Sequence, residues 1–272
     1  MKKLIQLNLM LSVDLKTCLL TTMFFTLLSF AHAFNLLSNS TLISVNLWDY
    51  LLISMGGVFV HGRFWMLFGW ISTIAPMLFY IYYLVGATGD FDIFVLTRIG
   101  SRGRWWMAKF LTGICLVVLY SILYLFVHLI IGTIFFSVEP NWSSFSQLNY
   151  VQILQLRIQP ALLISFVWLL FVTGIMAFSI FAQAITIVFK NSSTVFIILT
   201  IMLLVLGEAY FLGFLPRELS PIIYPSFVDL FQREQDFSIY KKTISYNIFF
   251  SLISAVVCML LTRRYPFSSK KE

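Results

Sequence analysis

Three arginines in one polar stretch have the types and spacing of residues that bind another protein. Residues 86–109 read GATGDFDIFVLTRIGSRGRWWMAK and form the longest polar interruption between two long apolar runs. The apolar residues 93–96 lie between glycines, a pattern typical of a short helix with glycine at its ends. The stretch therefore predicts a helix that docks on a partner through apolar contacts and charges, and an ordinary basic anchor loop is the simpler alternative. The predicted docking residues are Asp92, Phe94, Val95, Leu96, Arg98, Arg102 and Arg104.

A second group of polar residues lies inside runs that are apolar enough to cross a bilayer. Glu208 stands near the end of the run 194–215, and an intramembrane acid is a functional candidate by default. It either faces a transport path or only reaches the membrane surface, and we expect the second. Gln183 and Thr186 lie three residues apart, on one face of a predicted helix. They either join helices by hydrogen bonds, which we favour, or line a path together with Glu208.

Catalytic and metal-binding patterns are absent from the sequence. There is no GxxxxGK[ST] phosphate loop and no GxGxxG fingerprint, so we expect no enzyme activity and no cofactor or metal bound to this chain. His32, His61 and His128 show no metal-ligand spacing, and His128 is expected to be a hydrogen-bonded core residue. Three cysteines in apolar runs predict buried thiols. An integral-membrane enzyme, which needs clustered catalytic side chains beside a span, is the alternative from another class, as is an accessory membrane protein without a transport role.

The composition places all of these residues in a polytopic membrane protein. Hydrophobic residues make up 60% of the chain, charged residues only 11%, and the mean hydropathy is +0.93. Too few polar side chains remain to cover a water-facing surface. The net charge of +7 does not predict nucleic-acid binding, because the basic residues flank apolar runs. We expect an all-α fold with one transmembrane domain over residues 1–272.

A membrane-spanning helix needs about 20 mostly apolar residues, and six runs meet this requirement. Leucines that recur every three or four positions in residues 1–16 predict a helix in the inner membrane interface. Residues 216–242 predict short helices on the outer face. Residues 42–60 carry Asn46 and Asp49, so we expect them on the outer face, either on its surface or dipping into the membrane. The predicted spans cover residues 17–37, 64–85, 110–136, 161–189, 194–215 and 244–262.

The distribution of charge predicts the orientation of these spans. With both termini on one side, twelve of the 18 lysines and arginines fall on that side, together with residues 86–109. Basic residues stay on the cytoplasmic side of a membrane. Both termini and residues 86–109 are therefore expected in the cytoplasm, with Trp105 and Trp106 in the belt of aromatic residues at the headgroup level.

The run LTRIGSRGRWWMAKFL, residues 96–111, resembles the loop after the second span in type-2 ABC exporter permeases of Gram-positive bacteria. The six-span layout extends this resemblance to nearly the whole chain. It implies a permease subunit in the bacterial plasma membrane, with residues 86–109 as the coupling helix that sits on a separate ATPase subunit holding ATP and Mg. A second permease subunit, identical or homologous, and a hydrophobic or amphipathic cargo such as a peptide, an antibiotic or a lipid-like molecule are also implied. The matching positions are Arg98, Gly100, Ser101, Arg102, Trp105, Trp106 and Lys109.

Overall fold

Helices make up almost all of the part of the chain that the computed structural model describes. Within this part, Asn46 and Ser137 form an isolated β-bridge and no strand is present. The predicted all-α class is therefore confirmed for the described residues. These are residues 2–39, 43–57, 64–85, 95, 98, 100–150, 154, 157–189, 192–216, 219–220, 225–228 and 237–264.

Five helices of the described part are long and apolar enough to cross a membrane. Large apolar side chains such as Leu19 and Phe249, 61% and 62% exposed, point away from the protein, as expected for surfaces that face lipid. The sixth expected span is α4 (Phe64–Val85), which has the predicted bounds; its crossing of the membrane stays a prediction. The five helices are α2 (Leu15–Asn39), α6 (Arg102–Phe135), α9 (Pro160–Phe189), α10 (Ser192–Phe211) and α12 (Phe237–Arg264).

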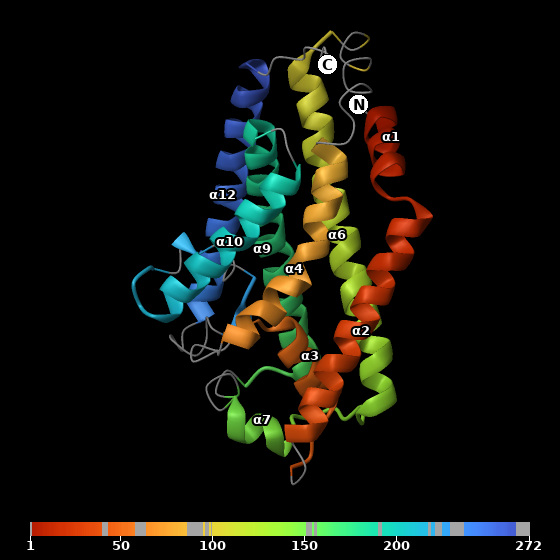
Figure 1. Ribbon diagram of the computed structural model, residues 1–272. Coiled ribbons are helices and arrows are strands. Elements are labelled where there is room, and N and C mark those ends of the chain that lie inside the picture. Colours follow the sequence, from red (N-terminus) through yellow and green to blue (C-terminus); the bar gives the residue numbers. More distant parts are fainter. Residues whose placement is uncertain are drawn as a thin grey trace.

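The helix α9 lies at the centre of the bundle. It contacts α12, α6, α4, α3 and α10, and its side chains Val167, Phe171 and Ile175 are completely buried. Figure 1 shows α1 (Lys2–Ser12), the start of α6 and the last turn of α12 at one end of the bundle, which we call the α1 end. The short helix α7 (Ser144–Asn149) lies at the opposite end, which we call the α7 end.

The helix α1 packs against α6 and α4 and turns polar side chains toward them. Asn8 and Ser12 are buried, whereas Leu7 and Leu11 of the predicted leucine face are exposed. Two members of the predicted leucine face thus point away from the protein, whereas Leu4 packs against a buried cluster. A break at Asp14 separates α1 from α2, and the Thr17 N–H donates to Asp14 Oδ1 at 2.7 Å. Hydrogen bonds from Thr17, first from its side chain and then from its backbone, lower the pKa of the Asp14 carboxyl.

Within residues 42–60 the chain forms α3 (Leu47–Met55), which runs into the bundle from the α7 end. The Leu47 N–H donates to the Ser137 carbonyl at 3.0 Å, just beyond the end of α6. Tyr124 Oη, about 20 Å back along α6 at 1.5 Å per residue, donates to the Ser54 carbonyl near the other end of α3 at 2.7 Å. The helix α3 therefore lies alongside α6 within the protein; whether residues 42–60 lie on the outer surface of a membrane or dip into it stays a prediction.

At the inner end of α3, Gly56 meets a segment 170 residues further along the chain. The backbone N–H groups of Phe227 and Val228 both donate to the Gly56 carbonyl at 2.8 Å. Gly57 has φ +92°, and a Cβ added there would lie 2.6 Å from Ser226 Cβ. Only glycine permits this approach, because it adopts positive φ freely and has no side chain. Residues 225–228, part of the segment expected to form short outer helices, close the end of α3. Most of the remainder of 216–242 lies outside the described residues, so the expected helices stay a prediction.

A buried carboxylate joins α3 to the α7 region. Asp49 is completely buried, and its Oδ2 accepts hydrogen bonds from Ser143 Oγ at 2.5 Å and from the Asn46 N–H at 2.8 Å. Ser146 Oγ donates to Oδ1. These three donors offset the cost of burying the charge. They explain how an acid that is expensive at membrane depth is accommodated in a helix that enters the bundle.

Candidate functional site

The predicted docking segment, residues 86–109, runs from the end of α4 into the first turns of α6. Of its predicted docking residues, Asp92, Phe94 and Leu96 lie outside the described residues. The other four are described. They divide into one buried residue, Val95, and three exposed arginines.

Arg98, Arg102 and Arg104 are all exposed, and the start of α6 lies at the α1 end (Figure 1). The last two lie in the first turn of α6, where Ser101 is the N-cap and its Oγ accepts from the Arg104 N–H at 3.4 Å. The 34 residues of α6 correspond to about 51 Å, which exceeds the hydrocarbon core of about 30 Å. Part of α6 must therefore extend beyond a membrane, and the arginines lie on its terminal turn.

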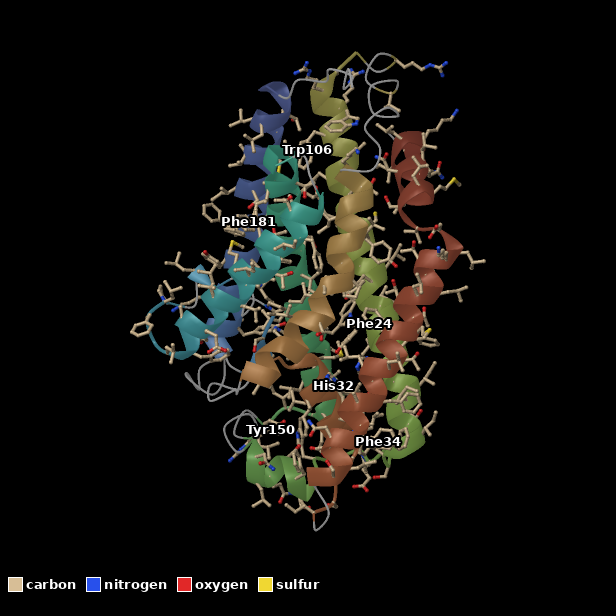
Figure 2. All side chains as sticks on the ribbon, in the orientation of Figure 1. Phe24, His32, Phe34, Trp106, Tyr150 and Phe181 are labelled. Carbon is tan, nitrogen blue, oxygen red and sulfur yellow. The ribbon has the colours of Figure 1, made fainter. Side chains whose placement is uncertain are left out.

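Val95 anchors the segment to the bundle. It is 8% exposed and packs in a small cluster with Trp106 of α6, Ile187 of α9 and Cys258 of α12. Val95 is therefore not a surface contact, and any docking surface must come from its neighbours. Trp106 Nε1 donates to the Ala255 carbonyl at 3.2 Å, and Figure 2 labels this residue near the α1 end.

The two tryptophans do not form an exposed belt. Trp105 and Trp106 are 4% and 2% exposed. The expectation of headgroup-facing rings is wrong for both, because their indoles fill contacts between helices. An aromatic residue beside a span is equally suited to packing inside the protein and to contacting lipid, and composition does not distinguish the two.

Lys109 is the basic residue whose placement differs most from the expectation. It is 1% exposed, and its Nζ donates a hydrogen bond to the Leu84 carbonyl in the last turn of α4. The ammonium also lies 4.9 Å from the centre of the Trp105 ring, within reach of a cation–π attraction. The last carbonyls of a helix have no partner within the helix and carry partial negative charge. The Lys109 ammonium therefore caps α4 from α6.

Gln183 and Thr186, two of the predicted path residues, are both buried in α9. Thr186 Oγ1 donates to the carbonyl of Ala182 at 2.8 Å, so its hydroxyl is satisfied within its own helix. The Gln183 amide lies against α6, where a Cβ added at Gly113 would be 2.5 Å from its Nε2. Neither amide atom of Gln183 has a hydrogen-bond partner among the described residues, and the same holds for Ser179 Oγ one turn away. No hydrogen bond from Gln183 to another helix therefore supports its favoured helix-joining role in the described part of the chain.

Glu208, the third predicted path residue, does not lie with the other two. It is half-buried, close to the end of α10. Gln183 is about 9 Å along the axis from the end of α9, whereas Glu208 is about 24 Å from the beginning of α10. Since these two helix ends adjoin, the structure separates Glu208 from Gln183. Its possible partner Arg217 lies outside the described residues.

The structure brings together two histidines that sequence spacing does not connect. The His32 and His128 ring centres are 5.8 Å apart, from α2 and α6. His128 Nδ1 lies 2.9 Å from the Tyr124 carbonyl, in line with the expected hydrogen-bonded core residue. Its Nε2 and the Nδ1 of His32 are buried without a hydrogen-bond partner in the described part of the chain. A pair formed across two helices has no signal in a single sequence, so the spacing of the histidines along the chain does not reveal it.

No group of three or more histidine, cysteine, aspartate or glutamate side chains that could hold a metal ion occurs among the described residues. All three cysteines are free, but only Cys258 is buried, while Cys18 is half-buried and Cys115 is exposed. The expectation of buried thiols is thus right for Cys258 alone.

No protein-family model, curated protein or solved structure matches this chain.

Proposed function

We propose that this chain is the membrane-spanning permease subunit of an ATP-driven exporter, working with a separate ATPase subunit that holds ATP and Mg. It belongs in a bacterial plasma membrane, with both termini in the cytoplasm and a second permease subunit beside it. The proposal draws on the resemblance of residues 96–111 to the coupling loop of type-2 ABC permeases. It also draws on the five candidate membrane spans and on the common position of α1, the start of α6 and the end of α12.

The observation that carries the proposal is the bond between Lys109 and Leu84. The docking segment connects the end of α4 with the start of α6 along the chain. Lys109 joins these two points, so a force on the segment acts on both helices together. Through Val95 and Trp106 the same region also contacts α9 and α12.

The docking surface itself combines charge and apolar area. The exposed Arg98, Arg102 and Arg104 supply charge that steers and orients a partner. The segment's other apolar residues, Phe94 and Leu96, supply the anchors, since Val95 is directed inward. ATP-driven movement of the partner would then displace the ends of α4 and α6, and with them the helices around α9.

The cargo is hydrophobic or amphipathic in this proposal. The side chain best suited to contact a polar group of such a cargo is Gln183, because its buried amide has no hydrogen-bond partner within the described part of the chain. Thr186 and Glu208 play a smaller part, since the first is satisfied by its own helix and the second lies away from Gln183.

The proposal is tested by reconstituting the purified chain into proteoliposomes together with an ABC ATPase from the same cells that co-purifies with it. ATP-dependent movement of a fluorescent amphipathic peptide, absent when a non-hydrolysable nucleotide replaces ATP, is the expected result. If the chain recruits no ATPase and moves no such probe, the proposal is wrong.

The proposed orientation is tested separately in intact cells. Single cysteines are placed at Ser144 and Ser269 in a version without Cys18, Cys115 and Cys258. An impermeant thiol reagent should label the cysteine at position 144 and leave that at position 269 unlabelled. The opposite pattern would overturn the orientation.

A further inference from the structure

The side chain of His128 is held in one tautomer. Its Nδ1 lies 2.9 Å from the Tyr124 carbonyl, and since a carbonyl oxygen only accepts, Nδ1 carries the proton and donates it. In the neutral imidazole the other nitrogen, Nε2, then presents a lone pair. This nitrogen is buried and has no hydrogen-bond partner among the described residues. A histidine that donates one N–H to a backbone carbonyl and offers the other nitrogen is the usual arrangement of a metal ligand.

His32 presents a second nitrogen of the same kind. Its Nδ1 is buried and has no hydrogen-bond partner in the described chain, while the residue as a whole is partly exposed. Figure 2 labels His32 on α2, close to α3. The two ring centres are 5.8 Å apart with an angle of 51° between the ring planes. If one metal ion lay in line between the two nitrogens, each metal–nitrogen bond would be about 2.0 Å long. Adding the distance from each nitrogen to the centre of its ring places the ring centres about 6 Å apart, close to the observed separation.

Aromatic rings cover the His128 imidazole and favour positive charge beside it. The Tyr124 ring centre is 4.0 Å from that of His128, and the Tyr50 ring stacks on it at 5.9 Å. The faces of aromatic rings carry negative potential, which attracts cations within about 6 Å. No charged side chain approaches the pair in the contacts described for it, so an ion with a small charge is favoured over one that needs carboxylate neutralisation.

We propose that His32 Nδ1 and His128 Nε2 bind one Cu(I) ion between α2 and α6. Imidazole is a good copper ligand, and monovalent copper is stable with two nitrogen ligands in line. Zinc in proteins takes four ligands, and calcium and magnesium favour carboxylate oxygens; among the described residues no third histidine, cysteine, aspartate or glutamate joins the pair. The site is independent of the transport function proposed above.

The test uses the full chain, purified in detergent without a histidine tag and titrated under reducing conditions with Cu(I) against a chromogenic Cu(I) chelator. We expect one Cu(I) per chain, and X-ray absorption that shows two nitrogen neighbours. His128→Gln and His32→Gln should each weaken retention by at least about tenfold, the size of loss that even the partners of metal ligands produce. Thiols also bind Cu(I) and are the competing explanation for any binding. A variant with Cys18, Cys115 and Cys258 all changed to serine should bind like the wild type, because the proposed site contains no thiol.

Folding is checked in each variant by elution as a single species and by thermal stability. His32→Phe serves as a second variant at the more exposed position, should His128→Gln not fold. Failure of the wild type to hold Cu(I) against the chelator would overturn the proposal. A water molecule that bridges the two histidine nitrogens would then be the alternative. Retention that is lost in the cysteine-free variant and kept in His32→Gln and His32→Phe would overturn it as well.

Discussion

The Lys109 ammonium of α6 donates a hydrogen bond to the Leu84 carbonyl in the last turn of α4. A lysine next to a membrane span ordinarily extends into water, but this one is 1% exposed. It closes the base of the segment that connects the two helices. In the proposed function, this hydrogen bond makes α4 and α6 move together when a partner displaces residues 86–109.

Lys109→Met keeps the length and apolar character of the side chain and removes its charge and donors. We expect a loss of about 1–3 kcal/mol, because a buried carbonyl loses its donor. We also expect ATP hydrolysis to become uncoupled from transport while the ATPase still binds. The measurement is thermal unfolding in detergent together with the ratio of transport to hydrolysis. Lys16→Met, at an exposed position, is the control and should cost within about 0.5 kcal/mol; equal behaviour of the two variants would refute the coupling role.

Gly57→Ala tests the contact between α3 and residues 225–228. Alanine there must adopt φ +92° and place its Cβ 2.6 Å from Ser226 Cβ. Gly213→Ala is a matched control, because its φ is +79° but nothing lies within 4 Å of the added atom. The control should lose about 1–2 kcal/mol from the left-handed backbone alone. Gly57→Ala should lose clearly more and yield little monodisperse protein, and similar thermal stability of the two proteins would show that the close approach is absent.

Asp49→Asn tests the network that joins α3 to the α7 region. The carboxylate accepts from Ser143, Ser146 and the Asn46 N–H, and an amide cannot accept at both of its atoms. We expect a loss of about 1–3 kcal/mol, and a double-mutant cycle with Ser146→Ala should show coupling between the two sites. Glu139→Gln, at an exposed acid near the same end, should leave thermal stability almost unchanged. Additive effects of Asp49→Asn and Ser146→Ala would contradict the network.

Gln183→Met separates a helix-joining role from a path-lining role. An amide without bonds gains nothing from burial, so an apolar side chain of similar shape should leave stability unchanged or raise it. Transport should fall, because the polar group offered to the cargo is gone. Glu208→Gln is the comparison, and its transport should stay near that of the wild type. A clear loss of thermal stability in Gln183→Met would instead show that the amide joins helices.

The lengths of the apolar runs predicted the central helices well. Residues 64–85 form α4 with the expected bounds, and the expected span 161–189 differs from α9 by one residue. The helices α6 and α12 begin eight and seven residues before the predicted spans, at 102 and 237 against 110 and 244. Polar and charged residues continue these helices beyond the apolar run, and a hydropathy threshold stops where the lipid-facing surface stops.

The relationships between helices could not be predicted in the same way. The charge rule counts Lys109 as a cytoplasmic anchor, and nothing in its neighbours along the chain shows that a carbonyl of α4 lies within reach. Ser143 and Ser146, whose hydroxyls donate to the buried Asp49, come from a segment nearly a hundred residues away. The pairing of His32 with His128 likewise depends on the packing of α2 against α6.

The most direct test of the account compares Phe94→Ala with Arg104→Ala in co-purification of the ATPase and in stimulated ATP hydrolysis. An exposed charge contributes about 0–1 kcal/mol to a contact, whereas an apolar anchor in a packed interface can contribute about 2 kcal/mol or more. Phe94→Ala should therefore weaken recruitment at least several-fold more than Arg104→Ala, with both proteins inserted and monodisperse. Unchanged recruitment and hydrolysis in Phe94→Ala, or a purified wild-type chain that recruits no ATPase, would contradict the account.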